Sequence, residues 1–274
     1  MHLRSLTCGG GASGRSTREP RRGCHAFYLF GFVCACAFGV VPLVGCGDDS
    51  SGGAGTGGGG TGGAGGGAEP VQLTLTVIEG ATGADRPPLE GVAFCETDTA
   101  NCAMTDANGQ ATIEIDVPAD GQISYTYAKD GYASVLRTEV VDDTFVGERT
   151  NFTLPDETMV DLSEAVMTPY PYNGTGSATV DVGLSGATLE VVGASSEAFY
   201  YDETLWPDPA LEATTSSGWG AFVEVAPGEV EIRLGGTATN CVAAFGWPGS
   251  EANTVRMPIR VGFVSWSSAS CEPQ

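Results

Sequence analysis

Hydrophobic and polar residues alternate along most of the chain beyond residue 70. In 71–77 the apolar residues are separated by Gln72, Thr74 and Thr76, and 110–117 shows the same pattern. A period of two is typical of β-strands with one buried face. Turn-forming residues separate such segments about every eight to twelve positions, which predicts roughly seven strands and an antiparallel β-sandwich in 70–155. The other predicted strands include 91–95, 123–127, 135–141 and 145–154.

Residues 156–274 show a related pattern and are predicted to form a second, diverged β-sandwich. Adding 109 to four positions of the first segment gives the same order of turn, strand and proline turn. The four pairs are Thr105 and Thr214, Gly109 and Gly218, Ile113 and Phe222, and Pro118 and Pro227. The predicted strands are 178–182, 187–191, a stretch between 218 and 227, 229–234, 241–245 and 255–266. A less regular connection is expected at 155–172, and an insertion at 200–211.

The chain before residue 70 has a different pattern. Residues 1–25 are basic and polar, 26–45 are uncharged and mostly apolar, and 47–68 consist almost only of Gly, Ala, Ser and Thr. The first two parts have the order of a secretory signal, although the apolar run is long enough to remain as a membrane anchor instead. The third lacks side chains that could build a core, so it is predicted to be a disordered tether.

The boundary between the apolar run and the tether carries a short motif, Leu43, Val44, Gly45 and Cys46. It resembles the lipobox of bacterial lipoproteins, here of the myxobacterial type. The resemblance implies cleavage after Gly45 and lipidation of Cys46, so that acyl chains hold the protein on a lipid membrane. Gly47 then favours the outer membrane of the cell envelope. The predicted division is a signal peptide at 1–45, a lipidated linker at 46–69, and the sandwiches at 70–155 and 156–274.

Charge and composition exclude several classes of function. The net charge is −22, and 33 of the 34 acidic residues follow Cys46, so binding to the phosphate backbone of a nucleic acid is not expected. Both histidines, His2 and His25, precede Cys46. The remainder therefore lacks the histidine of a Ser-His-Asp or Cys-His site and of a His-ligated zinc site. No cofactor, metal or catalytic residue is predicted.

Four cysteines follow Cys46: Cys95, Cys102, Cys241 and Cys271. An even number in an oxidising compartment indicates disulfide bonds, and three pairings are possible. We expect Cys95–Cys102 across a loop of the first sandwich and Cys241–Cys271 at the carboxyl-terminal tail.

Four short segments of the first sandwich lie in a familiar order: 89–92, 105–111, 117–118 and 130–132. Together they resemble carboxypeptidase regulatory-like domains, over about 80 residues. Ala111 or Thr112 stands where that family usually has an aromatic residue. The resemblance implies a transthyretin-like β-sandwich with a structural or adhesive role and without catalytic residues. Within it, 106–109 is predicted to be a tight turn rather than part of a calcium loop, because further oxygen ligands are missing.

Three functions remain open on the sequence. The first is an envelope lipoprotein whose sandwiches are non-catalytic structural or interaction modules, with an unknown protein or polysaccharide partner. The second is a carbohydrate-binding or adhesive protein, suggested by aromatic residues near loops. These are Tyr170, Tyr172, Tyr200, Tyr201, Trp206, Trp219 and Trp247. The third is a glycosidase that uses paired carboxylates, with Asp142–Asp143 and Asp202–Glu203 as candidates.

Overall fold

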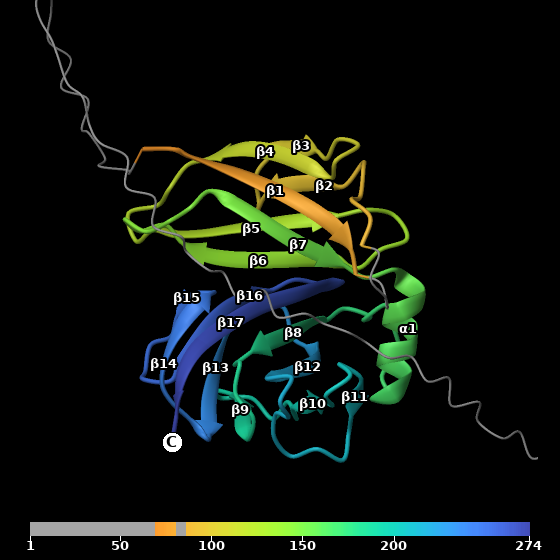
Figure 1. Cartoon of the computed structure of the whole chain (residues 1–274), viewed down its shortest axis with the longest axis vertical. Coiled ribbons are helices and arrows are strands. Elements are labelled where there is room, and N and C mark those ends of the chain that lie inside the picture. Colours follow the sequence, from red (N-terminus) through yellow and green to blue (C-terminus); the bar gives the residue numbers. More distant parts are fainter. Residues whose placement is uncertain (1–68, 81–85) are drawn as a thin grey trace, which may run out of the picture.

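The computed structural model describes residues 69–80 and 86–274, so the signal segment, the lipobox and the glycine-rich linker lie outside the described residues. Strands dominate the described part, and helix α1 (Asp156–Ala165) is the exception (Figure 1). The predicted all-β class with small β-sandwich domains is confirmed. Nowhere in the described ranges is there a helix long and apolar enough to cross a membrane.

The first sandwich contains seven strands within 70–155. A sheet in the order β4-β1-β7 faces strands paired in the order β3-β2-β5-β6. Their bounds are β1 (Val71–Glu79), β2 (Ala93–Glu96), β3 (Cys102–Met104), β4 (Gln110–Ile115), β5 (Gln122–Ala128), β6 (Ser134–Val140) and β7 (Glu148–Thr153). The alternation of apolar and polar residues explains how the two layers pack. Leu73, Leu75 and Val77 are fully buried and pack against Phe94 and Tyr125 of the facing strands.

The second sandwich follows α1. Strands β8, β12 and β17 pair in the order β12-β8-β17 and face a sheet in the order β15-β16-β13-β9. The bounds are β8 (Gly176–Asp181), β9 (Ala187–Val191), β10 (Phe199–Tyr201), β11 (Pro207–Asp208), β12 (Trp219–Val225), β13 (Gly228–Gly236), β14 (Ala238–Phe245), β15 (Trp247–Pro248), β16 (Thr254–Ile259) and β17 (Phe263–Pro273). Its core includes Phe222, Ile232 and Met257.

The two sandwiches have the same strand topology. The antiparallel pair β1–β4 corresponds to β8–β12, the series β2-β5-β6 to β9-β13-β16, and the parallel pair β1–β7 to β8–β17. One buried threonine makes the same contacts in each. The hydroxyl of Thr105, and likewise that of Thr214, donates to a carbonyl at 2.6 Å and accepts from a backbone N–H at 2.9 Å. The partners are Leu89 and Val92 in the first sandwich and Leu184 and Ala187 in the second.

A single sheet runs through both sandwiches. Strands β6 and β17 pair in parallel and join the two halves into one sheet of ten strands, in which β14 also pairs with β17. We call it the central sheet. Val264 lies opposite both Val135 and Ser177, whereas its neighbour Ser265 lies opposite Leu136 and Ala178. Val135 belongs to the first core and Ala178 to the second. Because neighbouring residues of a strand point to opposite faces, the two cores lie on opposite faces of the central sheet.

Three expectations from the sequence are wrong. The pairing is not purely antiparallel, because β1–β7, β6–β17 and β8–β17 are parallel. The connection at 155–172 contains α1, which begins after Pro155 and has Asp156 and Glu157 in its first turn, a place where acidic residues stabilise a helix. The stretch 255–266 forms two strands, β16 and β17, since Gly262 turns the chain with a φ of 77°.

Candidate functional site

The lipobox residues Leu43, Val44, Gly45 and Cys46 lie outside the described residues. Lipidation of Cys46 therefore stays a prediction. Within the described ranges, no group of three or more His, Cys, Asp or Glu residues is placed to hold a metal ion.

Both predicted disulfide bonds are confirmed. Cys95–Cys102 joins the neighbouring strands β2 and β3, and Cys241–Cys271 joins β14 to β17. The two bonds span 7 and 30 residues of sequence, respectively. The four cysteines are thus cross-strand links in the two sandwiches.

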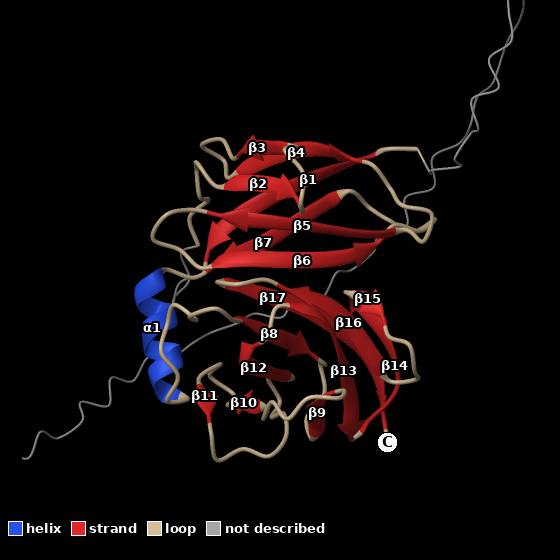
Figure 2. Cartoon of the chain, turned by 180° about the vertical axis from the view of Figure 1, so that it is seen from behind, coloured by secondary structure: helices blue, strands red, loops and turns tan. Residues whose placement is uncertain are grey.

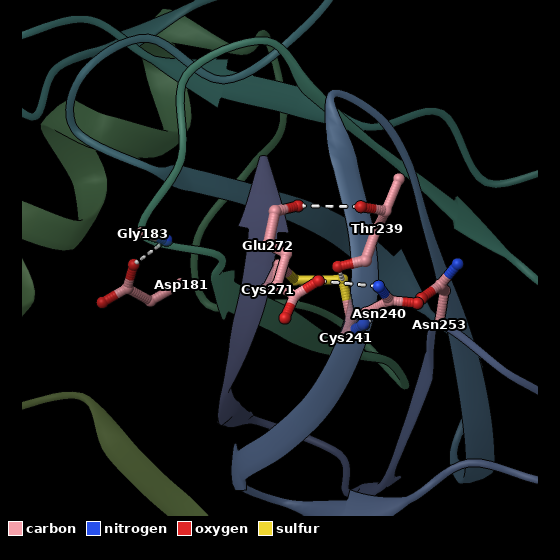
Figure 3. Close-up of a disulfide and its surroundings, with 8 residues drawn as sticks. All are labelled: Asp181, Gly183, Thr239, Asn240, Cys241, Asn253, Cys271 and Glu272. Atoms are coloured by element: carbon pink, nitrogen blue, oxygen red, sulfur yellow. Dashed lines mark hydrogen bonds between the residues drawn. A yellow bond between two sulfur atoms is a disulfide. The ribbon is translucent and has the colours of Figure 1, made fainter. Parts of the chain in front are cut away.

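Polar contacts surround the second disulfide (Figure 3). The backbone N–H of Cys241 donates to Asn253 Oδ1 at 2.8 Å, and Asn240 Nδ2 donates to Glu272 Oε2 at 2.7 Å. Thr239 Oγ1 donates to the carbonyl of Glu272 at 3.1 Å. These contacts fix the irregular pairing of β14 with the end of β17, so the site is structural.

One residue of each acidic pair proposed for a glycosidase stabilises a turn. Asp142 Oδ1 accepts from both the N–H and the hydroxyl of Thr144, at 2.8 and 2.7 Å. Asp202 Oδ1 accepts from Thr204 in the same way and also from the N–H of Trp206 at 2.9 Å. The bonds from Thr144 lower the pKa of Asp142. Burial alone would raise the pKa of Asp202, but its three hydrogen bonds lower it.

A general acid needs a raised pKa in order to keep its proton near neutral pH. Asp142 and Asp202 have the opposite shift, and neither is placed as the acid of a hydrolytic pair.

The turn predicted at 106–109 is confirmed by the same kind of contact. Asp106 Oδ1 accepts from the N–H groups of Gln110 and Asn108 at 3.0 and 2.8 Å, and these bonds lower the pKa of Asp106.

A buried ionic cluster, which was not predicted from the sequence, lies beside the junction of β6 and β17. Glu139 is 3 % exposed and receives Nε of Arg149 on both carboxylate oxygens, at 2.9 and 2.8 Å. Tyr125 donates its hydroxyl to the same carboxylate at 2.5 Å, and burial together with this carboxylate raises the pKa of Tyr125. The guanidinium of Arg137 lies 4.7 Å from the Trp266 ring centre on β17. Charged side chains of the first sandwich thus contact an aromatic ring of the second.

A cavity of the described part lies between α1 and the central sheet. It has a volume of about 160 Å³, and we call it the α1 cleft. Strands β8, β10, β12 and β17 supply one wall and α1 supplies the other, with β7 at one end. Figure 2 shows α1 beside the second sandwich.

Aromatic rings form a continuous series along the sheet wall of the α1 cleft. Phe152 meets Trp266 at 4.7 Å between ring centres, and Trp266 meets Trp219 at 4.8 Å. Tyr201 follows at 6.5 Å from Trp219, and Phe199 at 5.5 Å from Tyr201. The series runs from the last strand of the first sandwich to β10 of the second, so it crosses the junction.

The seven aromatic residues singled out in the sequence are not gathered in one exposed row. Tyr201, Trp219 and Tyr172 line the α1 cleft. Tyr200 is buried in the second core, and among the seven only Trp206 is exposed, by 37 %. The remaining two hold parts of the fold together. Trp247 Nε1 of the second sandwich donates to the carbonyl of Ile123 in the first at 3.1 Å, and Tyr170 donates to Asp156 at the start of α1 at 2.9 Å.

No protein-family profile and no curated protein matches this sequence. Among solved structures, it is similar to the minor pilin GBS52 of Streptococcus agalactiae (14% identity over 74% of this chain and 97% of that chain, TM-score 0.24). It is also similar to the TIE protein of Bacillus anthracis (13% identity, 74% and 34% coverage, TM-score 0.24). A third is a mutant of the shaft pilin SpaA of Lactobacillus rhamnosus GG (13% identity, 76% and 99% coverage, TM-score 0.21). TM-scores this low do not establish a common topology, and the fold stands on the strand pairing described above.

Proposed function

We propose that this protein is a non-catalytic lipoprotein of the cell envelope, with acyl chains on Cys46 holding its folded body on a membrane. The body serves as a structural or interaction module. The observation that carries the proposal is the central sheet, which makes one continuous unit of two sandwiches. A separate hinge between the modules would need a break in strand pairing, whereas β6 and β17 pair directly. Such a unit is suited to holding or spacing a partner at a fixed distance.

The use of the acidic side chains supports a non-catalytic role. Asp142 and Asp202 stabilise turns, and Glu139 neutralises Arg149 in the buried cluster. Two of the four carboxylates suggested for catalysis, Asp142 and Asp202, therefore have structural partners of their own. Carbohydrate binding has less support than an interaction role, since the aromatic residues proposed for it are distributed between the core, the junction and the α1 cleft.

The proposal extends to the origin of the sandwiches. We infer that the first sandwich is a carboxypeptidase regulatory-like domain and the second a diverged copy of it. The support is the sequence resemblance in 89–132 together with the equivalent contacts of Thr105 and Thr214. Gly47 directly after the lipidated cysteine supports the outer membrane as the final location.

Metabolic labelling with palmitate tests the anchor. The full chain and its Cys46→Ala variant are expressed in a bacterium with a lipoprotein pathway, and Cys36→Ala serves as the matched control from the apolar run. We expect label on the parent and on the control, and none on Cys46→Ala. Equal labelling of all three would refute the proposal, because the acyl group would then be attached elsewhere or not at this motif.

A further inference from the structure

Helix α1 does not pack closely on the sheet that it covers. Only Met159 and Ser163 of the helix are buried. The helix is held mainly near its first residue, where Asp156 receives the Tyr170 hydroxyl at 2.9 Å and donates its N–H to the carbonyl of Gly131 at 3.0 Å. Farther along, the Ser163 hydroxyl lies 3.4 Å from that of Tyr172. Space is therefore left between the middle of α1 and the central sheet.

Small side chains on the sheet wall create this space. Ser177, Thr179 and Ala221 line the cleft and are 3 %, 8 % and 2 % exposed. Larger residues at these positions would fill it, as Leu and Val do in the cores. The other lining side chains are mostly aromatic or aliphatic, and an apolar space of this size is a poor site for water but a good one for a small hydrocarbon group.

One residue that lines the cleft has a backbone conformation that its side chain disfavours, since Leu205 has a φ of 62°. For residues other than Gly, Asn and Asp, such values are uncommon and are often found at ligand-binding positions. Asp202 holds this loop by three hydrogen bonds, so Leu205 is kept against the cleft by the fold. The φ of 56° at Met167 has another cause, because Met167 ends α1 by donating its N–H to the carbonyl of Glu164 at 3.1 Å.

The charge of the cleft selects one kind of ligand. Arg86 is the one charged side chain among the described residues that line it. None of the ion pairs among the described residues involves its guanidinium. In a chain with a net charge of −22, a cation thus lies beside an apolar cavity. It provides a favourable place for an anionic group at the end of an apolar ligand.

We propose that the α1 cleft binds an amphiphilic monocarboxylate. Its hydrocarbon part lies between Leu162 of α1 and the aromatic series that contains Trp219 and Trp266, and its carboxylate accepts hydrogen bonds from Arg86. A sugar would fit this site poorly, because each of its hydroxyl groups would lose water and find few polar partners. The inference concerns residues 86–266 and does not depend on lipidation of Cys46.

Isothermal titration calorimetry of the full-length chain tests the ligand class with two probes of equal chain length. Octanoate carries the carboxylate and octanol does not. We expect both to bind, octanoate about tenfold more tightly, which corresponds to about 1.4 kcal/mol. Arg86→Gln removes the charge and keeps a polar side chain, and it should abolish the difference between the two probes without weakening octanol.

Two substitutions on neighbouring positions of α1 test the location. Leu162→Trp places an indole in the cleft, whereas Val160→Trp places the same side chain at a position that is 39 % exposed. We expect Leu162→Trp to weaken octanoate and octanol at least about tenfold and Val160→Trp to leave both unchanged. Ala221→Leu fills the cleft from the sheet side and provides a second test if Leu162→Trp does not fold.

Several results would overturn the proposal. Binding of neither probe to the parent chain would show that the cleft takes no amphiphile of this class. Equal binding to the parent, Leu162→Trp and Ala221→Leu would show that the probes bind elsewhere. An unchanged preference for octanoate in Arg86→Gln would show that Arg86 does not receive the carboxylate.

Discussion

The two sandwiches share a topology but differ in what covers the central sheet. In the first, the sheet β4-β1-β7 packs on it directly, and Leu73, Leu75 and Val77 are fully buried between the two layers. In the second, the sheet β9-β13-β16-β15 covers one face, and the other face has α1 and an open cleft. Both sandwiches therefore have a closed core, and the second has in addition helix α1 and the α1 cleft.

This difference indicates that stability and candidate ligand binding depend on different segments. The strands common to both copies carry stability, and the segments without a counterpart carry the candidate binding chemistry. Helix α1, the loop that contains Leu205 and the hairpin of β10 and β11 all belong to the second group. These segments do not close a sandwich core, so their side chains can be suited to a ligand.

Substitution in the buried ionic cluster beside the junction should lower the free energy of unfolding more than the other substitutions below. Glu139→Ala leaves Arg149 without its buried partner, next to Arg137, and we expect the free energy of unfolding to fall by about 3–5 kcal/mol. Urea unfolding followed by circular dichroism measures it. Glu190→Ala is the matched control, because the Glu190–Arg233 pair is exposed and should contribute less than about 1 kcal/mol. Similar losses in the two variants would contradict a special role of the junction.

The two disulfide bonds should stabilise the copies unequally. Replacing Cys241 and Cys271 by Ser opens a loop of 30 residues and should cost about 3.5 kcal/mol, since the stabilisation grows with the closed loop. Replacing Cys95 and Cys102 opens only 7 residues, and the expected loss is about 2.5 kcal/mol. Thermal unfolding of the two double variants compares them. A larger loss for the shorter loop would argue that strain or local packing, and not loop closure, sets the contribution.

Substitution of Thr105 and of Thr214 should lower the free energy of unfolding by similar amounts. Thr105→Val and Thr214→Val keep the side-chain shape but leave a buried carbonyl and N–H without partners, so each should lose about 2 kcal/mol. The hydroxyl contacts have the same lengths in both copies, and the two losses should agree within about 0.5 kcal/mol. A marked difference between the variants in chemical denaturation would show that the two positions are not equivalent in energy.

A small effect of pH should distinguish the copies. Glu231 of β13 accepts hydrogen bonds from Thr254 and Ser250, which lower its pKa to about 2, whereas the uncharged Gln122 stands 109 positions earlier in β5. A lowered pKa means that the carboxylate stabilises the fold above its unfolded pKa and loses this effect as the pH falls toward 2. Glu231→Gln should therefore flatten the loss of stability between pH 4.5 and 2. An unchanged pH profile of the unfolding free energy would contradict the assignment.

The part of the fold that follows local patterns could be predicted from the sequence. Alternation gives the buried faces of β1, β4 and β5, and turn residues such as Asp106 and Gly109 separate the strands. The cysteines in adjoining strands were paired correctly, because each pair lies across a short or terminal segment. The common order of turns and strands could be predicted from Thr105 and Thr214, which lie 109 positions apart and make equivalent contacts in the two sandwiches.

The features that depend on distant pairing could not be predicted. Apart from Arg137 and Glu139, nothing near Ser134 or Phe263 shows that their strands lie side by side, because both strands mix apolar and polar residues and could pair with many others. Helix α1 has a weak pattern, with Met159 and Ser163 as its buried residues. The α1 cleft depends on Ser177, Thr179 and Ala221 facing a helix, and small residues in a strand show no sign of what covers them. The charges of Arg137 and Glu139 in an otherwise apolar strand were the one available signal of the junction.

The two sandwiches form one continuous unit through β6 and β17. Distance measurement by pulsed electron paramagnetic resonance tests it directly, with spin labels attached through unnatural amino acids at Val146 in the first sandwich and Val242 in the second. Both side chains are exposed, by 63 % and 64 %, so the labels should not disturb the cores. A shared sheet predicts one narrow distribution of distances. A broad distribution, or two separate distances, would contradict it, because the modules would then move independently.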